Sequence, residues 1–152
     1  MDFAINEETI KKKLEPYGVL GVRSMEYGEN HVYVVHLLSL PLLVQNIVTI
    51  TVGTQRFKTS SGIIFDSKDV SEKVVQEAEK MMRAVAERAG VTLRKSAEVY
   101  WFETESNISA TFDEGINKIM EAIIELNALF SKNSRVRDEC LHKKYATLFS
   151  LT

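Results

Sequence analysis

The sequence contains few of the residues that build covalent or metal-bound sites. Cys140 is the only cysteine among 152 residues, so no disulfide can form within the chain, as is typical of proteins in a reducing compartment. The histidines number three, His31, His36 and His142. A structural zinc site needs about four ligands at close spacing, and Cys140 with His142 supplies two. We therefore expect no metal centre.

Sequence motifs for nucleophilic catalysis and phosphate binding are also missing. The chain has no Gly-x-Ser-x-Gly elbow, no Gly-x-x-x-x-Gly-Lys phosphate loop and no Gly-x-Gly-x-x-Gly dinucleotide motif. Ser60 and Ser61 precede Gly62, and these residue types are favoured in turns without any catalytic role. We expect a protein that is not an enzyme, with no catalytic residues and no cofactor.

Neither sign of charge dominates. Nineteen Lys and Arg stand against 21 Asp and Glu, which gives a net charge of −2 and little attraction to polyanions. Residues 99–102 form an aromatic run that could stack on bases, but Glu98, Glu103 and Glu105 flank it and would repel phosphates. We expect no nucleic-acid binding, although the locally basic segment 132–144 leaves it as a weaker alternative.

Long hydrophobic runs are absent as well. The most apolar stretch, residues 32–52, is interrupted by His36, Pro41, Gln45 and Asn46, whereas a membrane-spanning helix needs about 20 mostly apolar residues. The first 15 residues carry acidic side chains in place of the basic start of a secretion signal. We therefore expect a cytoplasmic protein that does not engage a membrane.

What the sequence does contain is a clear series of periodic segments. Apolar spacing of three and four residues predicts helices, and alternation or β-branched runs predict strands. The segment 40–44 contains Pro41, which cannot donate a hydrogen bond within a central strand, so we expect this segment at a sheet edge, a bulge or a crossover. Helices are predicted at residues 6–14, 69–90, 114–131 and 135–149, with Asp69 and Asp113 as caps; strands are predicted at 19–27, 31–38, 47–52, 56–65 (interrupted at 60–62), 98–103 and 108–112, the last two as a hairpin.

This order of elements predicts the fold class. Strands that follow one another with short turns favour an antiparallel sheet, and the helices are expected mainly on one of its faces. We therefore predict an α+β fold in the order α-β-β-β(-β)-α-β-β-α(-α). A chain of this length is expected to form one domain over residues 1–152, with a possible helical tail at 132–152.

The segment 116–130 is apolar around most of the predicted helix. Such a helix is buried on several sides, either under the terminal helix or against a second subunit or a client protein. If several of its side chains were exposed, they would be a liability worth about 1.5–3 kcal/mol each. The interface candidates are Trp101, Ile116, Ile119, Met120, Ile123, Ile124, Leu126, Leu129 and Phe130.

The element order, the long helix, the aromatic hairpin and the sequence Phe112-Asp113-Glu114-Gly115-Ile116 before the apolar helix resemble the type III secretion chaperones and the related YbjN-like proteins. The resemblance covers residues 6–130. It implies a small cytosolic homodimer that binds extended segments of client proteins, with the dimer region at residues 116–130 or in the strand before them.

These observations lead to two functional hypotheses. The first is a non-enzymatic, chaperone-like or regulatory interaction module that acts as a homodimer. The second is a small-ligand-binding protein or an enzyme with a pocket between sheet and helix, for which Tyr33, His36, Tyr100 and Glu98 are the candidate lining residues.

Overall fold

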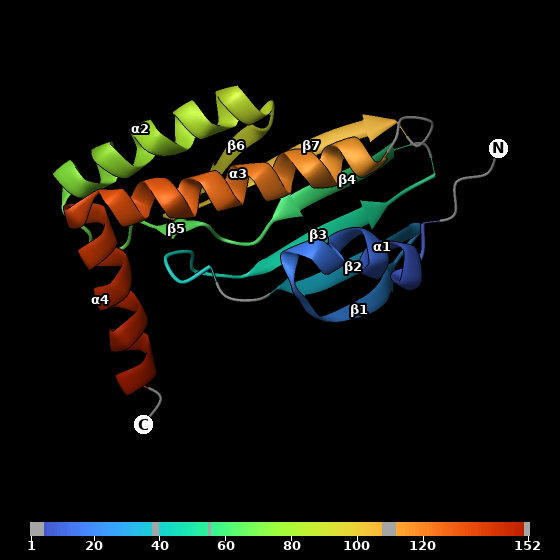
Figure 1. Cartoon of the computed structure of the whole chain (residues 1–152), viewed down its shortest axis with the longest axis horizontal. Coiled ribbons are helices and arrows are strands. Elements are labelled where there is room, and N and C mark those ends of the chain that lie inside the picture. The colour runs from blue at the N-terminus through green and yellow to red at the C-terminus, as the bar shows by residue number, and fades with distance from the viewer. Residues whose placement is uncertain (1–4, 38–39, 55, 108–111, 151–152) are drawn as a thin grey trace.

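The structure is a computed structural model that describes residues 5–37, 40–54, 56–107 and 112–150. Within these residues the predicted α+β fold is confirmed, in the predicted order of elements (Figure 1). The helices are α1 (Glu7–Leu14), the 3-10 helix η1 (Glu15–Tyr17), α2 (Glu72–Ala89), α3 (Phe112–Lys132) and α4 (Ser134–Ser150). The strands are β1 (Val19–Tyr27), β2 (Asn30–Leu37), β3 (Ile47–Val52), β4 (Arg56–Ser61), β5 (Phe65–Asp66), β6 (Thr92–Ser96) and β7 (Val99–Asn107).

The strands form one antiparallel sheet. Strands β1, β2, β3, β4 and β7 lie side by side, and β6 pairs with the far side of β7. Strand β5 pairs with the first residues of β7, on the same side as β4. The strand predicted at 56–65 is interrupted, and both of its halves line one edge of β7, but the break lies at residues 62–64 and not at 60–62, because Ser60 and Ser61 still pair with β3. The edges of the described sheet are β1 and β6.

The interruption between β4 and β5 is filled by the connection from β2 to β3. The Gln45 backbone N–H donates to the carbonyl of Ile63 at 2.9 Å, and the Ile63 N–H donates to the Gln45 side-chain oxygen at 2.9 Å. A Cβ atom at Gly62 would lie 2.6 Å from Cγ1 of Ile47, so only glycine permits this close approach. The Pro41 segment is thus part of a connecting loop rather than of a strand edge.

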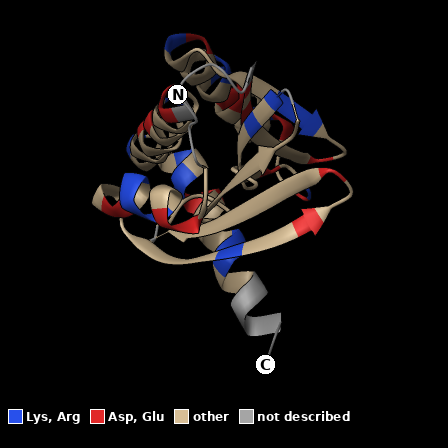
Figure 2. Cartoon of the chain, turned by 90° about the vertical axis from the view of Figure 1, so that its right-hand side faces the viewer, with Lys and Arg blue, Asp and Glu red and all other residues tan. Residues whose placement is uncertain are grey.

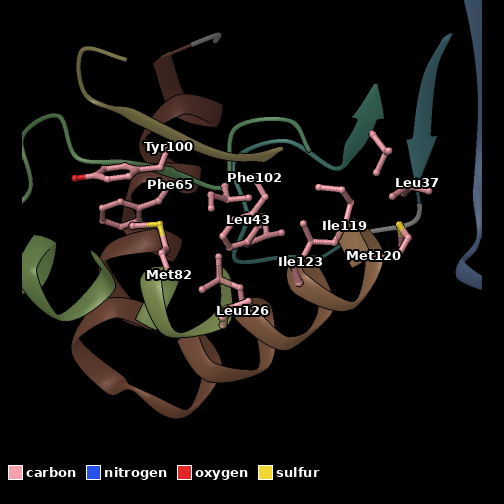
Figure 3. Close-up of a cluster of buried hydrophobic side chains, with 14 of the residues drawn as sticks. Leu37, Leu43, Phe65, Met82, Tyr100, Phe102, Ile119, Met120, Ile123 and Leu126 are labelled. Atoms are coloured by element: carbon pink, nitrogen blue, oxygen red, sulfur yellow. The ribbon is translucent and has the colours of Figure 1, made fainter. Parts of the chain in front are cut away.

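The helices cover one face of the sheet, as Figure 1 shows for α1 and α3 in front of it. Tyr33, Ile50 and Phe102 point to this face, and their side chains are buried. Figure 3 shows the centre of the core, where side chains of the sheet meet those of α2 and α3. Leu43 of the connecting loop also points into this cluster, so the loop is anchored by apolar contact.

The predicted aromatic hairpin is wrong in its pairing. Strand β7 continues without a turn from Val99 to Asn107, and its hairpin partner is β6, which precedes it. The turn between them includes Ala97 with φ of 54°, a conformation that alanine rarely adopts. Strand β6 was missed because Thr92-Leu93-Arg94-Lys95-Ser96 has only one apolar side chain. Most of the segment predicted as the second strand, residues 108–111, lies outside the described residues.

Two predicted helix caps also differ. Helix α2 is capped by Ser71, whose Oγ accepts from the N–H of Val74 at 3.4 Å. Asp69 instead adopts a left-handed conformation with φ of 59°, so it cannot cap the helix. Asp113 lies inside α3, because that helix already begins at Phe112. The cap predicted at Asn6 is present in α1, and a last helix forms as predicted.

Candidate interaction surfaces

Helix α4 turns sharply away from the end of α3 and extends across the end of the sheet (Figure 1). The turn is fixed by Asn133, whose side-chain oxygen accepts from the N–H of Val136 at 3.1 Å and so caps α4. Val136 is fully buried, and Arg135 lies 3.4 Å from Glu77 of α2. The first turns of α4 are therefore anchored to the body, and the later turns stand beside it.

A cleft of about 570 Å³ lies between α4 and the body. We call it the α4 cleft. Its floor is formed by side chains buried in the core, among them Leu42, Leu43 and Phe65. It is lined by Pro41, Leu42, Leu43, Val44, Phe65, Asp66, Asp69, Val70, Glu139, Cys140, His142, Lys143, Lys144 and Ala146. The arrangement is an apolar floor with a charged rim.

Two lysines of α4 hold the helix over this cleft. The Lys144 ammonium donates to the carbonyl of Pro41 at 2.9 Å. The Lys143 ammonium donates to the carbonyl of Asp66 at 3.0 Å, and it lies 3.8 Å from the Asp66 carboxylate. Because each lysine contacts a different wall, together they fix the width of the cleft.

Cys140 lies in the cleft as a neutral thiol. Burial raises the pKa of Cys140 to about 11, the nearby Glu139 carboxylate adds to this effect, and Lys143 opposes it. A thiol acts as a nucleophile or a metal ligand through its thiolate, which is scarce near pH 7 at this pKa. Among the described residues no three His, Cys, Asp or Glu side chains gather as metal ligands.

Six of the predicted interface residues lie inside the subunit. Helix α3 packs on β4, β7 and α2, so that both of its flanks are covered. The expectation that these side chains meet a partner does not hold for them, because a second chain cannot reach them without opening the core. The six are Ile116, Ile119, Met120, Ile123, Leu126 and Phe130, each at most 2% exposed.

The other three candidates remain accessible. Ile124 is 41% exposed on the outer side of α3, and Leu129 is partly buried. Trp101 lies on the face of the sheet opposite the helices, opposite Arg94 of β6. The structure does not bring all three together, since Ile124 and Leu129 lie on α3 and Trp101 lies on the opposite face of the sheet.

The uncovered face of the sheet carries a cluster of charges at Glu103. Its carboxylate lies 2.9 Å from Lys58 and 2.8 Å from Arg94, and the residue is 7% exposed. Burial alone would raise the pKa of Glu103, but the hydrogen bonds from Lys58 and Arg94 outweigh it and lower that pKa. The glutamate predicted to flank the aromatic run is thus neutralised by its neighbours.

The lining residues predicted for a ligand pocket do not converge. Tyr33 points to the helical face, where its hydroxyl donates to the carbonyl of Ile5 at 3.2 Å. His36 is paired with Ile47 and points to the opposite face. The buried Tyr100 donates to Glu79 at 3.1 Å, and Glu98 lies in the turn before β7. A pocket between sheet and helix does exist, but it is the α4 cleft, which none of these residues lines.

The basic segment 132–144 does not form one cationic surface. Arg135 pairs with Glu77 and Arg137 with Asp138, while Lys143 and Lys144 point into the cleft walls. Figure 2 shows Lys and Arg interspersed with Asp and Glu over helices and strands. Most of these cationic side chains are therefore already engaged in ion pairs or hydrogen bonds within the chain, which weakens their attraction for a polyanion.

Besides Ile124, the exposed large apolar side chains among the described residues belong to β1, α4 and the loop before β3. Leu20 and Tyr27, at 68% and 67%, both belong to strand β1. Val44 lines the α4 cleft, whereas Tyr145 lies on α4 outside its lining. The α4 cleft is not predictable from the sequence, because no local pattern indicates that Pro41 and the lysines of α4 meet.

The comparisons with known proteins bear on the fold. No family model and no curated protein matches the chain. A crystal structure of an uncharacterized protein from Methanothermobacter thermautotrophicus is similar, with a TM-score of 0.55 and 14% identity over 84% of this chain and 98% of that one. At this identity the likeness shows a shared fold alone. None of the described helices has the length and apolarity that a membrane crossing demands.

Proposed function

We propose that the chain is a non-enzymatic interaction module that acts as a homodimer and holds an apolar segment of a client protein in the α4 cleft. The observation that carries this proposal is the cleft itself, whose floor is apolar and whose wall, α4, stands apart from the body. The resemblance of the element order to type III secretion chaperones favours the same role.

The chemistry of the cleft supports binding rather than catalysis. Its thiol is protonated at neutral pH, and its two lysines already donate to backbone carbonyls. The exposed side chain of Val44, which lines the cleft, extends the apolar floor outward, so a segment can bury a side chain against it. Grooves that bind amphipathic segments use such a row of apolar contacts with polar rims.

The test is suppression of the aggregation of a model client, the reduced insulin B chain, followed by light scattering. The wild-type protein is expected to delay aggregation, and Val44→Asp is expected to lose most of this effect. Ile124→Asp is the matched control, because it also removes an exposed branched side chain but lies on α3, outside the cleft. Equal loss in both variants, or no suppression by the wild type, would overturn the proposal.

The α4 cleft also favours the alternative of a small apolar ligand. Its volume lies within the range of about 300–1,000 Å³ that ligand pockets occupy. A melting screen against a broad metabolite set distinguishes the two functions. Stabilisation by a small molecule, lost when Ala146→Trp fills the cleft, would favour the ligand; aggregation suppression without any such stabilisation favours the client.

A further inference from the structure

The two edges of the sheet differ in how well they are protected against pairing. Strand β6 is short and carries Arg94 and Lys95, which discourage the addition of another strand. Strand β1 runs for nine residues and pairs only with β2 among the described strands. It also carries Leu20 and Tyr27, the two most exposed large apolar side chains described. The β1 edge is therefore the less protected one.

The regular part of β1 has a defined centre. The register to β2 shifts between Val19 and Gly21, so Leu20 is a bulge and the regular strand covers residues 21–27. Ser24 is the midpoint of that range. If two copies of this strand pair antiparallel around a two-fold axis, the longest regular overlap places the axis at Ser24.

Side chains match in this register. Tyr27 of one copy then lies opposite Gly21 of the other, where a Cβ atom would meet nothing within 4 Å. An aromatic side chain packed over a glycine of a neighbouring strand stabilises sheet edges. Arg23 lies opposite Met25, so no like charges meet. Moving the axis to Arg23 would place two guanidinium groups opposite each other, which is unfavourable.

We propose that β1 pairs with β1 of a second copy of this chain, antiparallel about a two-fold axis at Ser24, so that two sheets join into one. The inference rests on the homodimer in the proposed function and names its interface. It leaves the α4 cleft of each copy free, because no residue of β1 lines it.

The first test is sedimentation of full-length variants from low to high micromolar concentration. Ser24 is exposed in the single chain, so Ser24→Lys is expected to fold normally. In the dimer it would place two ammonium groups face to face and raise the dissociation constant on the order of tenfold or more. Ser24→Thr, which suits paired strands, should remain dimeric. Ser96→Lys applies the same change to the exposed end of β6 and should also remain dimeric.

The second test fixes the register by disulfide cross-linking in a Cys140→Ser background. Residues directly opposite in an antiparallel pair have Cα atoms about 4.5–5.5 Å apart, within the range of disulfides. Ser24→Cys should therefore form a covalent dimer on mild oxidation, and Arg23→Cys should not.

The outcomes separate this inference from the proposed function. A dimeric wild type that Ser24→Lys leaves unchanged would overturn the β1 interface and leave the homodimer standing. A wild type that is monomeric at high micromolar concentration would overturn both. Efficient cross-linking of Arg23→Cys in place of Ser24→Cys would overturn the proposed register.

Discussion

Helices α3 and α4 follow each other with only Asn133 between them, yet they are used in opposite ways. Helix α3 buries apolar side chains on both flanks, among them Ile116, Leu126 and Phe130. Of the α4 side chains described, Val136 alone is buried to this degree. The helix whose apolar sequence is compatible with either burial or an interface is thus part of the core, and the helix beside it is largely accessible.

The two faces of the sheet repeat this contrast. The face under α3 is held by apolar contact, and the opposite face by charges around Glu103. The apolar content of a segment therefore predicts that the segment must be buried, but it does not predict which surfaces of the fold remain exposed. Each of the following substitutions tests one side of the comparison.

The largest effect is expected inside α3. Phe130 is fully buried and packs edge-on against Phe65, with ring centroids 5.9 Å apart. Phe130→Ala should reduce the free energy of unfolding by about 3–5 kcal/mol, because it removes a buried ring and leaves a cavity. Tyr145→Ala on α4 should change it by less than about 0.5 kcal/mol. Urea denaturation measures both, and similar losses would contradict the contrast between the helices.

A smaller effect is expected on the uncovered face. Glu103→Gln should reduce the free energy of unfolding by about 1–2 kcal/mol at pH 7. This value is smaller than for a fully buried ion pair, because the Lys58 and Arg94 side chains are partly exposed to solvent. The lowered pKa of Glu103 means that its contribution is fully present above the ordinary glutamate pKa of about 4.3. It is lost as the pH falls from there through the lowered value.

Denaturation of wild type and Glu103→Gln at several pH values measures this dependence. The difference in stability between the two proteins should be constant from neutral pH to about pH 5 and shrink in more acidic solution. A difference that grows on acidification would mean that Glu103 is not held as a carboxylate in the folded state.

A stabilising change is expected under α3. The Thr59 hydroxyl is buried at the start of that helix, 3.4 Å from the position of a Cβ on Gly115, and has no hydrogen-bond partner among the described residues. Thr59→Val should raise the free energy of unfolding by about 1 kcal/mol, because it removes an unpaired buried polar group. Thr49→Val on the opposite face is the control and should change little. A loss of stability in Thr59→Val would show that the hydroxyl is bonded.

The smallest effect on stability is expected at the α4 cleft. Lys144→Ala should cost less than about 0.5 kcal/mol, yet it releases α4 from the Pro41 carbonyl. Cys140 reports this release, because its raised pKa of about 11 keeps the thiol unreactive near pH 8. Alkylation of wild type should quicken about tenfold per pH unit towards pH 11, and Lys144→Ala should react faster at pH 8. Lys12→Ala on α1 is the control, and equal rates in all three proteins would show that Lys144 does not hold the helix.

Most helices and the first strands could be predicted from local signals. Asn6 caps α1 through its own side chain, and Gly90 ends α2 in a left-handed conformation, so both boundaries are set within a few residues. The partner of β7 could not be predicted, because β6 is polar and the pairing depends on a turn at Ala97 that alanine disfavours. The cleft was also beyond prediction, since Pro41, Asp66 and Lys144 are far apart in the sequence.

The sequence by itself determined an α+β chain and, at Asn6 and Gly90, where a helix begins or ends. The reason is that caps, periodicity and turns act over a few neighbouring residues. Only the tertiary structure decided that α3 is enclosed and α4 is left beside a cleft, and that β1 and β6 are the edges. Burial depends on what else packs nearby, and no local pattern records which distant segment that will be.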